Sequence, residues 1–208
     1  EAGAQFVSDD GSKAEGYVNS DASIKTAEYL NEFIKNGYAN LDPVKDEFLN
    51  GKAATLLGGS WNIADLEKSN LNWGVSYFPV ADDGKAASPT GDWAAAITRD
   101  SKNPDAAGKF LQWAMNSDNI ASYASAVAKP ASRTSSYEKM EGWDSGARAL
   151  MKWQLQNTGV SRPRTPSYSV LSTDFSTAML NIFAGADAKE ELDNVAKNFD
   201  ENYEMYYK

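Results

Sequence analysis

The sequence predicts an α/β layer fold. Short apolar runs alternate with amphipathic segments in the first part of the chain, and amphipathic segments dominate the later part. With 208 residues, the chain is long enough to bury a substantial core in one or two domains. The predicted strands are few for so many amphipathic helices, which indicates an incomplete sheet. We therefore expect the chain to be part of something larger.

Three apolar runs are predicted to be strands. Residues 53–57 lie between glycines and are too few for a helix, and residues 73–80 end at a proline and an Asp-Asp-Gly turn. Residues 93–97 form the third run and follow a Pro-Thr-Gly turn. The polar stretch 8–20 contains two glycines, which predicts turns around further short strands.

Capping signals mark the ends of the amphipathic segments. The Ser-Asp pair at residues 20–21 can cap a helix that ends at Gly37, and the Asn-Pro pair at 103–104 begins another. Asp187 and Glu190 have the spacing of a capping box. Further helices are predicted from Pro43 to Gly51, from a Ser60 cap through Leu66, from Ser117 to Val127, from about Ser145 to Gln156, and through Leu171 and Ile182 to Gly185. After Pro130 the chain is predicted to be purely helical, except at residues 162–166, where prolines exclude a helix.

Composition excludes several classes of function. The formal net charge of −9 argues against binding to nucleic acid or to an anionic membrane, because both need clustered Lys and Arg. The absence of cysteine excludes disulfides, zinc–thiolate sites and thiol catalysis. The absence of histidine removes the commonest general base and metal ligand, and no cofactor is indicated. No apolar run is long enough for a transmembrane helix, and we expect any export signal to have been removed or to lie outside this sequence.

Short motifs follow one another along the chain. They are FLNGKAA at residues 48–54, GGSW at 58–61, TGDW at 90–93, SKNPDAA at 101–107, KPASR at 129–133 and RPRTPSY at 162–168. Each motif is weak alone, but their order and spacing resemble family 1 of the extracellular solute-binding proteins, the maltose-binding-protein-like receptors of bacterial ABC importers. The resemblance covers residues 21–197.

The resemblance implies a periplasmic-binding-protein-like fold of type II, of which this chain is the C-terminal half. In that family such motifs occupy the second half of a protein about twice as long. Residues 1–91 are expected to form the first part of the C-terminal lobe. Residues 92–130 are expected to form the hinge crossing and a segment of the N-terminal lobe, and residues 131–208 the helical return. Most of the N-terminal lobe is expected to be missing from the chain.

The resemblance also implies a function in sugar transport. The protein is expected to capture a sugar or oligosaccharide by hinge closure and to deliver it to a membrane permease. Its expected location is extracellular, either lipid-anchored at the cell surface or periplasmic. Six Trp and ten Tyr residues fit this expectation, because aromatic rings cover the apolar faces of a pyranose.

Two segments supply the first candidate ligand-binding residues. Trp61 and Ser60 follow two glycines at the start of a helix, where side chains and free N–H groups meet a cleft. Asp92 and Trp93 lie at the expected hinge crossing, which lines the cleft of a two-lobed receptor. The alternatives are a core role for both tryptophans and a surface turn for Asp92.

Further candidates come from the last two motifs. Tyr168 follows a loop stiffened by prolines, which can hold its ring over a ligand. Arg133, Arg162 and Arg164 can donate forked hydrogen bonds to sugar hydroxyls or to the carboxylate of an acidic sugar. The alternative for Arg162 or Arg164 is an ion pair with a surface carboxylate. The family often has an aromatic residue slightly further along, where this sequence has Ser172 and Thr173, so the position of a second stacking platform stays open.

Two other functions compete with transport. A fragment of a carbohydrate-active enzyme would need a pair of carboxylates in one cleft, and the sequence offers only Asp92. The Gly58-Gly59-Ser60 stretch lacks the G-x-S-x-G pattern of a nucleophile elbow, so no catalytic residue is predicted and the protein is expected not to be an enzyme. A stand-alone glycan-binding module would bind its ligand without a second lobe. Trp113, Trp143 and Trp153 are predicted to be packing residues of helices.

Overall fold

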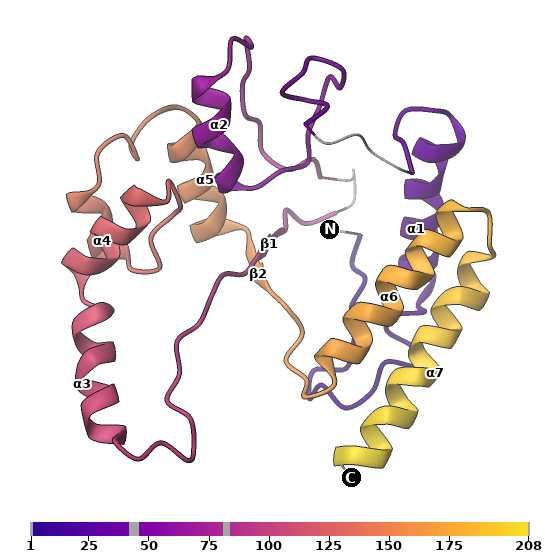
Figure 1. Ribbon diagram of the computed structural model, residues 1–208. Coiled ribbons are helices and arrows are strands. Elements are labelled where there is room, and N and C mark those ends of the chain that lie inside the picture. Colours follow the sequence, from indigo (N-terminus) through magenta and orange to yellow (C-terminus); the bar gives the residue numbers. More distant parts are fainter. Residues whose placement is uncertain (1, 42–45, 81–83, 208) are drawn as a thin grey trace. The chain divides into compact units, whose positions relative to one another are not determined.

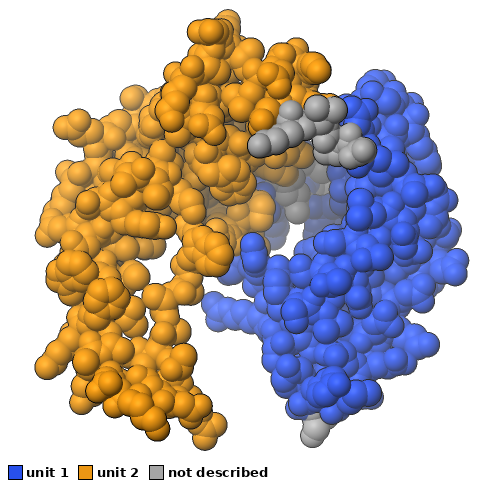
Figure 2. All heavy atoms as spheres, viewed as in Figure 1, with its two compact units in different colours: residues 1–45, 79–87, 161–208 blue, residues 46–78, 88–160 orange. Residues whose placement is uncertain are grey.

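The computed structural model describes residues 2–41, 46–80 and 84–207 (Figure 1). These residues form two compact units (Figure 2). Unit 1 comprises Glu1–Lys45, Pro79–Ala87 and Ser161–Lys208, and unit 2 comprises Asp46–Phe78 and Ser88–Val160. Each unit is described by itself.

Unit 1 is built from three helices: α1 (Asp21–Lys35), α6 (Tyr168–Phe183) and α7 (Ala188–Tyr207). Helices α6 and α7 are joined by a short turn and lie side by side, and α1 packs against both (Figure 1). Their apolar faces enclose a core whose largest fully buried side chains are those of Val18, Leu171, Ile182, Leu192 and Phe199. Burial of these faces is the main contribution to the stability of unit 1.

The predicted ends of these helices are confirmed. The Ser20 side chain caps α1 by accepting a hydrogen bond from the Ser23 N–H. Gly37 ends α1 in the left-handed conformation, with φ of 70°. The Asp187 carboxylate accepts a hydrogen bond from the Glu190 N–H at 2.9 Å, as the capping spacing predicts.

Unit 2 contains four α-helices, α2 (Ile63–Lys68), α3 (Pro104–Ala114), α4 (Ser117–Ala126) and α5 (Gly146–Asn157), together with 3-10 helices at Ser60–Asn62 and Thr134–Lys139. A second core lies between α4 and the segment that follows it. It is formed by Ile120, Ala121, Ala124, Ala131, Tyr137, Met140 and Trp143. The rings of Tyr137 and Trp143 meet edge to face at 5.7 Å, so the predicted packing role of Trp143 is confirmed, but Trp143 lies before α5 and not on a helix as predicted.

The sheet of the described residues has two short strands, β1 (Ser88–Thr90) and β2 (Gly159–Ser161). The Ser88 N–H donates to the Thr158 carbonyl at 2.8 Å, and the Thr90 hydroxyl donates to the Val160 carbonyl at 3.1 Å. Strand β2 corrects the prediction that the chain is purely helical after Pro130. Residues 162–166 are not helical, as their prolines predict.

The strands predicted at 53–57, 73–80 and 93–97 are wrong, and the described part of the stretch 8–20 forms turns without strands. Leu57 is 75% exposed and Trp93 is 91% exposed, although both lie in apolar runs. An apolar run becomes a strand only where a second strand satisfies its backbone groups. Among the described residues no segment pairs with these three runs.

Two helix predictions also need correction. Pro43 lies outside the described residues, and residues 46–51 form turns rather than a helix. The predicted cap Ser60 is instead the first residue of the 3-10 turn Ser60–Asn62, which Gly59 caps, and Asn62 is the cap residue of α2. A glycine is tolerated at such a cap because the conformation is extended and the Asn62 side chain satisfies its N–H.

Helix α3 has the predicted amphipathic pattern but no buried residue. Phe110 and Trp113 are each 61% exposed, and their rings contact each other at 5.8 Å. Trp153 of α5 is 45% exposed and contacts the Tyr77 ring at 4.8 Å. The packing role predicted for Trp113 is therefore not realised within unit 2, where the Phe110 and Trp113 side chains stay largely exposed.

None of the helices in the described ranges combines the length and the apolar character that crossing a lipid bilayer requires.

The end of α4 gives a prediction about stability. Ala128 follows the helix with φ of 51°, and the Lys129 N–H closes the motif on the Ala124 carbonyl at 2.9 Å. An L-residue is strained in this left-handed conformation, whereas glycine is not. We expect Ala128→Gly to raise the free energy of unfolding by about 0.5–1 kcal/mol. Chemical denaturation measures the change. Ala106→Gly, at an exposed helical position, should instead lower stability, and a loss from Ala128→Gly of the same size would contradict the strain.

Candidate functional site

Trp61 presents an exposed indole ring at a turn built from two glycines. The 3-10 turn Ser60–Asn62 begins directly after Gly59, whose N–H donates to the Asn62 side chain at 3.1 Å. The indole lies so close to Gly59 that a Cβ atom there would overlap its six-membered ring. The Trp61 side chain is nevertheless 64% exposed. Local contacts therefore orient a large apolar surface that faces water.

The segment that carries Trp61 is tied to helix α5 by an ion pair. The Arg148 guanidinium forms a two-pronged contact with the Glu67 carboxylate of α2, with Nη2 and Oε2 2.8 Å apart. The hydrogen bond from Arg148 lowers the pKa of Glu67, so this carboxylate stays ionised at neutral pH. Planar forked pairs fix geometry better than a point charge does. Helix α2 is thereby anchored immediately after the Trp61 turn.

Ser60 shares this turn and is half-buried. Its hydroxyl forms no hydrogen bond with the residues that the structure describes. A hydroxyl beside an exposed indole can donate a hydrogen bond to a ligand hydroxyl or accept one from it.

Asp92 and Trp93 form a second group on unit 2. The Asp92 Oδ1 atom accepts hydrogen bonds from the Trp93 backbone N–H at 2.8 Å and from Lys129 Nζ at 3.0 Å. These two bonds, the backbone one first, lower the pKa of Asp92 below its ordinary value. Trp93 is 91% exposed. The core role considered for Trp93 is therefore wrong within unit 2.

Arg133 has a local partner instead of a free guanidinium. Its Nε atom donates to the carbonyl of Met115, the residue that ends α3. A cation at this carbonyl satisfies a group that the end of a helix leaves unpaired. One edge of Arg133 is thus used in joining the loop after α4 to the end of α3.

Arg164 lies on unit 1 in the loop before α6, and Tyr168 is the first residue of that helix. The Arg162 guanidinium of this loop lies over the Tyr168 ring, 5.8 Å from its centroid. Gly11, with φ of 72°, approaches the Arg164 carbonyl so closely that a Cβ atom would overlap it. The Ser167 hydroxyl contacts the Asn202 side chain of α7 at 3.0 Å. The loop backbone is therefore held on both sides.

The seven predicted ligand-binding residues thus fall into two groups. Unit 2 carries Ser60, Trp61, Asp92, Trp93 and Arg133, and unit 1 carries Arg164 and Tyr168. Asp92 and Trp93 are in direct contact through the hydrogen bond between them. Their joint role in ligand binding stays a prediction.

Sequence reasoning missed Lys129 and the contact between Arg162 and Tyr168. Lys129 belongs to the KPASR motif, but its partner Asp92 lies 37 residues earlier. No local sequence pattern predicts an ion pair between residues so far apart in the chain. Arg162 and Tyr168 are only six residues apart, and the loop between them contains two prolines. This short spacing is the signal from which their contact could have been predicted.

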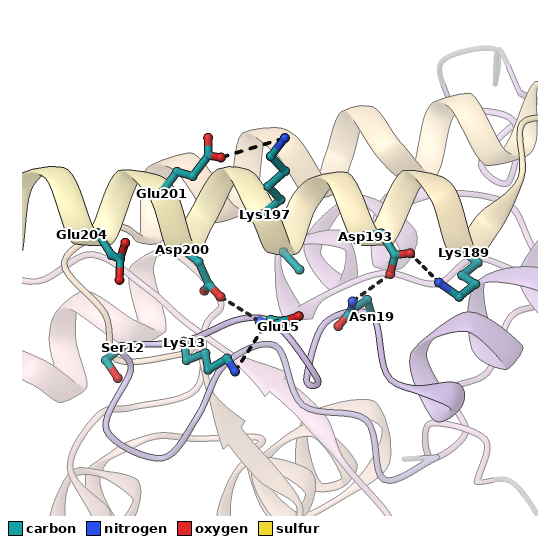
Figure 3. A pocket seen from close by; sticks show the side chains of 11 residues that line it. Ser12, Lys13, Glu15, Asn19, Lys189, Asp193, Lys197, Asp200, Glu201 and Glu204 are labelled. Atoms are coloured by element: carbon teal, nitrogen blue, oxygen red, sulfur yellow. Dashed lines mark hydrogen bonds and ion pairs between the residues drawn. The ribbon is translucent and has the colours of Figure 1, made fainter.

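A polar groove of about 880 Å³ lies on unit 1 (Figure 3), and none of the seven predicted residues lines it. It lies between the loop at residues 12–19 and one side of α7. Asp200 accepts hydrogen bonds from the backbone N–H groups of Ala14, at 2.6 Å, and Glu15. The Asp193 carboxylate accepts from Lys189 and from Asn19, and these bonds lower its pKa. These contacts attach the N-terminal loop to α7. Among the described residues, no group of acidic side chains is placed to hold a metal ion.

The comparison with protein families decides the identity of the chain. The family model described as "Bacterial extracellular solute-binding protein" matches residues 1–150. The chain belongs to this family. The family assignment made from the ordered motifs is therefore confirmed.

Two relatives from Bacillus subtilis (strain 168) are similar in sequence. The maltodextrin-binding protein MdxE is 23% identical over 158 residues, which cover 76% of this chain and 38% of the relative. The galactooligosaccharide-binding protein is 23% identical over 191 residues, which cover 86% of this chain and 45% of the relative.

Solved structures show the fold. The GacH receptor of Streptomyces glaucescens matches with a TM-score of 0.82 at 21% identity, over 100% of this chain and 55% of the receptor. The maltose-binding periplasmic protein MalE from Listeria monocytogenes, in complex with maltose, matches with a TM-score of 0.78 at 19% identity, over 100% of this chain and 56% of that protein. The predicted type II periplasmic-binding-protein-like fold is confirmed. The chain spans about half the length of these structures.

Proposed function

We propose that this solute-binding protein captures a sugar or oligosaccharide as the substrate-binding component of an ABC importer. The observation that carries the proposal is the exposed Trp61 indole, oriented by a glycine turn in a chain of this family. Covering about 60 Å² of this ring with a pyranose face contributes roughly 1.5 kcal/mol. The names of the relatives, which bind maltodextrin and galactooligosaccharide, support a carbohydrate as ligand.

Capture proceeds by hinge closure in this proposal. Sugar contacts from two lobes favour the closed state, which the membrane permease recognises. The C-terminal lobe supplies ring faces and hydrogen-bonding groups through Ser60, Trp61, Arg133, Arg164 and Tyr168. The hinge crossing supplies them through Asp92 and Trp93. No residue breaks a bond, so the sugar is released unchanged.

The predicted lobe organisation is part of the proposal. Residues 1–91 and 131–208 belong to the C-terminal lobe, and residues 92–130 form the hinge crossing and part of the N-terminal lobe. The uncovered apolar face of α3, with Phe110 and Trp113, supports this assignment, because a second lobe would bury it. The protein works outside the cytoplasmic membrane, either lipid-anchored or periplasmic, in keeping with the extracellular description of its family.

Calorimetric titration tests the proposal. The protein is expressed from its complete gene and titrated with maltose, maltotriose, maltopentaose and a galactooligosaccharide. We expect saturable binding of at least one sugar, and chromatography of the same sample should recover that sugar unchanged. Absence of binding across the panel contradicts the proposal. Product formation would support the rival carbohydrate-active enzyme.

Gly59 gives a prediction about the orientation of the Trp61 ring. In Gly59→Ala the new Cβ atom would overlap the indole, so the ring must leave its position. A displaced rotamer costs about 0.5–1.5 kcal/mol, which corresponds to a loss of affinity of roughly twofold to tenfold for the tightest sugar of the panel. Gly74→Ala is the matched control, since nothing lies within 4 Å of its Cβ position. Equal affinities of the two variants would show that the ring position does not matter.

A further inference from the structure

Asp92 and Lys129 form a polar pair beside the most exposed large apolar side chain among the described residues, Trp93. Lys129 Nζ lies 3.0 Å from Asp92 Oδ1, and the Trp93 N–H donates to the same oxygen at 2.8 Å. No described residue donates a hydrogen bond to the other carboxylate oxygen, Oδ2. The Asp92 side chain is 47% exposed and that of Lys129 is 24% exposed. One oxygen is fixed, and the other can accept a hydrogen bond from a ligand.

The chemistry of this pair matches neighbouring hydroxyl groups. The ammonium of Lys129 has three donors and uses one of them for Asp92. The carboxylate is held as an acceptor, with its pKa lowered by the two hydrogen bonds. An acceptor and a donor side by side can accept a hydrogen bond from one sugar hydroxyl and donate a hydrogen bond to the next. Adjacent hydroxyls of a pyranose present this pattern, and the exposed Trp93 indole belongs to the residue next to Asp92.

The backbone at Lys129 is well held. Its N–H closes the end of α4 by donating to the Ala124 carbonyl at 2.9 Å, and Pro130 restricts the conformation that follows. The backbone of Lys129 is therefore fixed, and its side chain loses little conformational entropy when a ligand binds to the ammonium group.

We propose that Lys129 contacts the ligand and that, together with Asp92, it recognises two neighbouring hydroxyl groups of a bound pyranose. This inference rests on the proposed sugar-binding function. It adds a residue to the predicted site and gives the Asp92 carboxylate a defined partner in recognition.

Three variants of the protein, expressed from its complete gene, test the role of Lys129. They are titrated with the sugar of the panel that binds the wild-type protein most tightly. Lys129→Met removes the ammonium and should weaken binding by about tenfold, since hydrogen bonds to charged groups are the strong ones. Lys129→Arg retains the donors and should recover most of the affinity. Lys139→Met is the matched control, because Lys139 also pairs with an aspartate, Asp118, on unit 2. Its affinity should stay within twofold of wild type.

Monodeoxy analogues of that sugar distinguish contact from support. For the wild-type protein, removing the hydroxyl that Lys129 contacts should weaken binding, whereas Lys129→Met should bind that analogue and the parent sugar equally well. If Lys129→Met and Lys139→Met bind alike, or if every analogue loses as much in Lys129→Met as in wild type, the inference is overturned. A loss of affinity in Trp61→Ala would then leave the proposed function standing, whereas absence of binding by the whole panel removes both.

Discussion

Replacing Trp61 with alanine is expected to weaken the binding of the tightest panel sugar by at least tenfold. The indole is 64% exposed and is oriented by its contact with Gly59. Its removal therefore eliminates the apolar surface on which a sugar ring would stack. The direct loss of covered area is roughly 1.5 kcal/mol, which is about tenfold in affinity. Trp61→Phe retains a smaller ring, so its affinity for the sugar should lie between those of the wild type and Trp61→Ala. Isothermal titration of the complete protein measures all three affinities.

The loss should not come from unfolding. An exposed side chain contributes little to stability, so the melting temperature of Trp61→Ala should stay close to that of the wild type. Tyr29→Ala is a suitable control, because Tyr29 is also 64% exposed but lies on α1 of unit 1. Unchanged affinity in Trp61→Ala, or an equal loss in Tyr29→Ala, would remove Trp61 from the site.

The largest expected effect on stability belongs to Gly11→Ala. Gly11 is buried with φ of 72°, and a Cβ atom there would overlap the backbone carbonyl of Arg164. The left-handed conformation costs an L-residue about 1–2 kcal/mol. A clash with backbone cannot be relieved by a side-chain rotation, so overpacking adds a further cost of about 1–3 kcal/mol. We expect the free energy of unfolding to fall by roughly 2–5 kcal/mol, as measured by denaturant titration.

Gly16→Ala separates the two causes. Gly16 has φ of 84°, but nothing lies within 4 Å of its Cβ position. The free energy of unfolding of this variant should fall only by the cost of the left-handed conformation, about 1 kcal/mol. If both variants lose the same amount, the close approach of Gly11 to the loop before α6 does not contribute to stability.

Helices were predictable from sequence where their signals are local. The cap of α1 at Ser20 and the spacing of Asp187 and Glu190 involve residues three positions apart, so the sequence contains the whole interaction. The runs at 53–57, 73–80 and 93–97 failed as strands for the opposite reason. A strand needs a partner segment, and apolar character alone does not identify one.

The candidate site shows the same division. The exposure of Trp61 follows from two adjacent glycines and the turn that they allow, and the sequence pointed to it. The pairing of Asp92 with Lys129, and of Gly11 with the Arg164 carbonyl, depends on how distant segments meet. Periodicity and capping contain no information about such contacts. Only the folded units show these contacts between distant residues.

The most direct test of the account is a crystal structure of the complete protein with the tightest sugar of the panel. We expect a pyranose ring stacked on the Trp61 indole, with carbon atoms about 4 Å apart, as in van der Waals contact. A sugar bound elsewhere, with the Trp61 ring still facing solvent, would contradict the account.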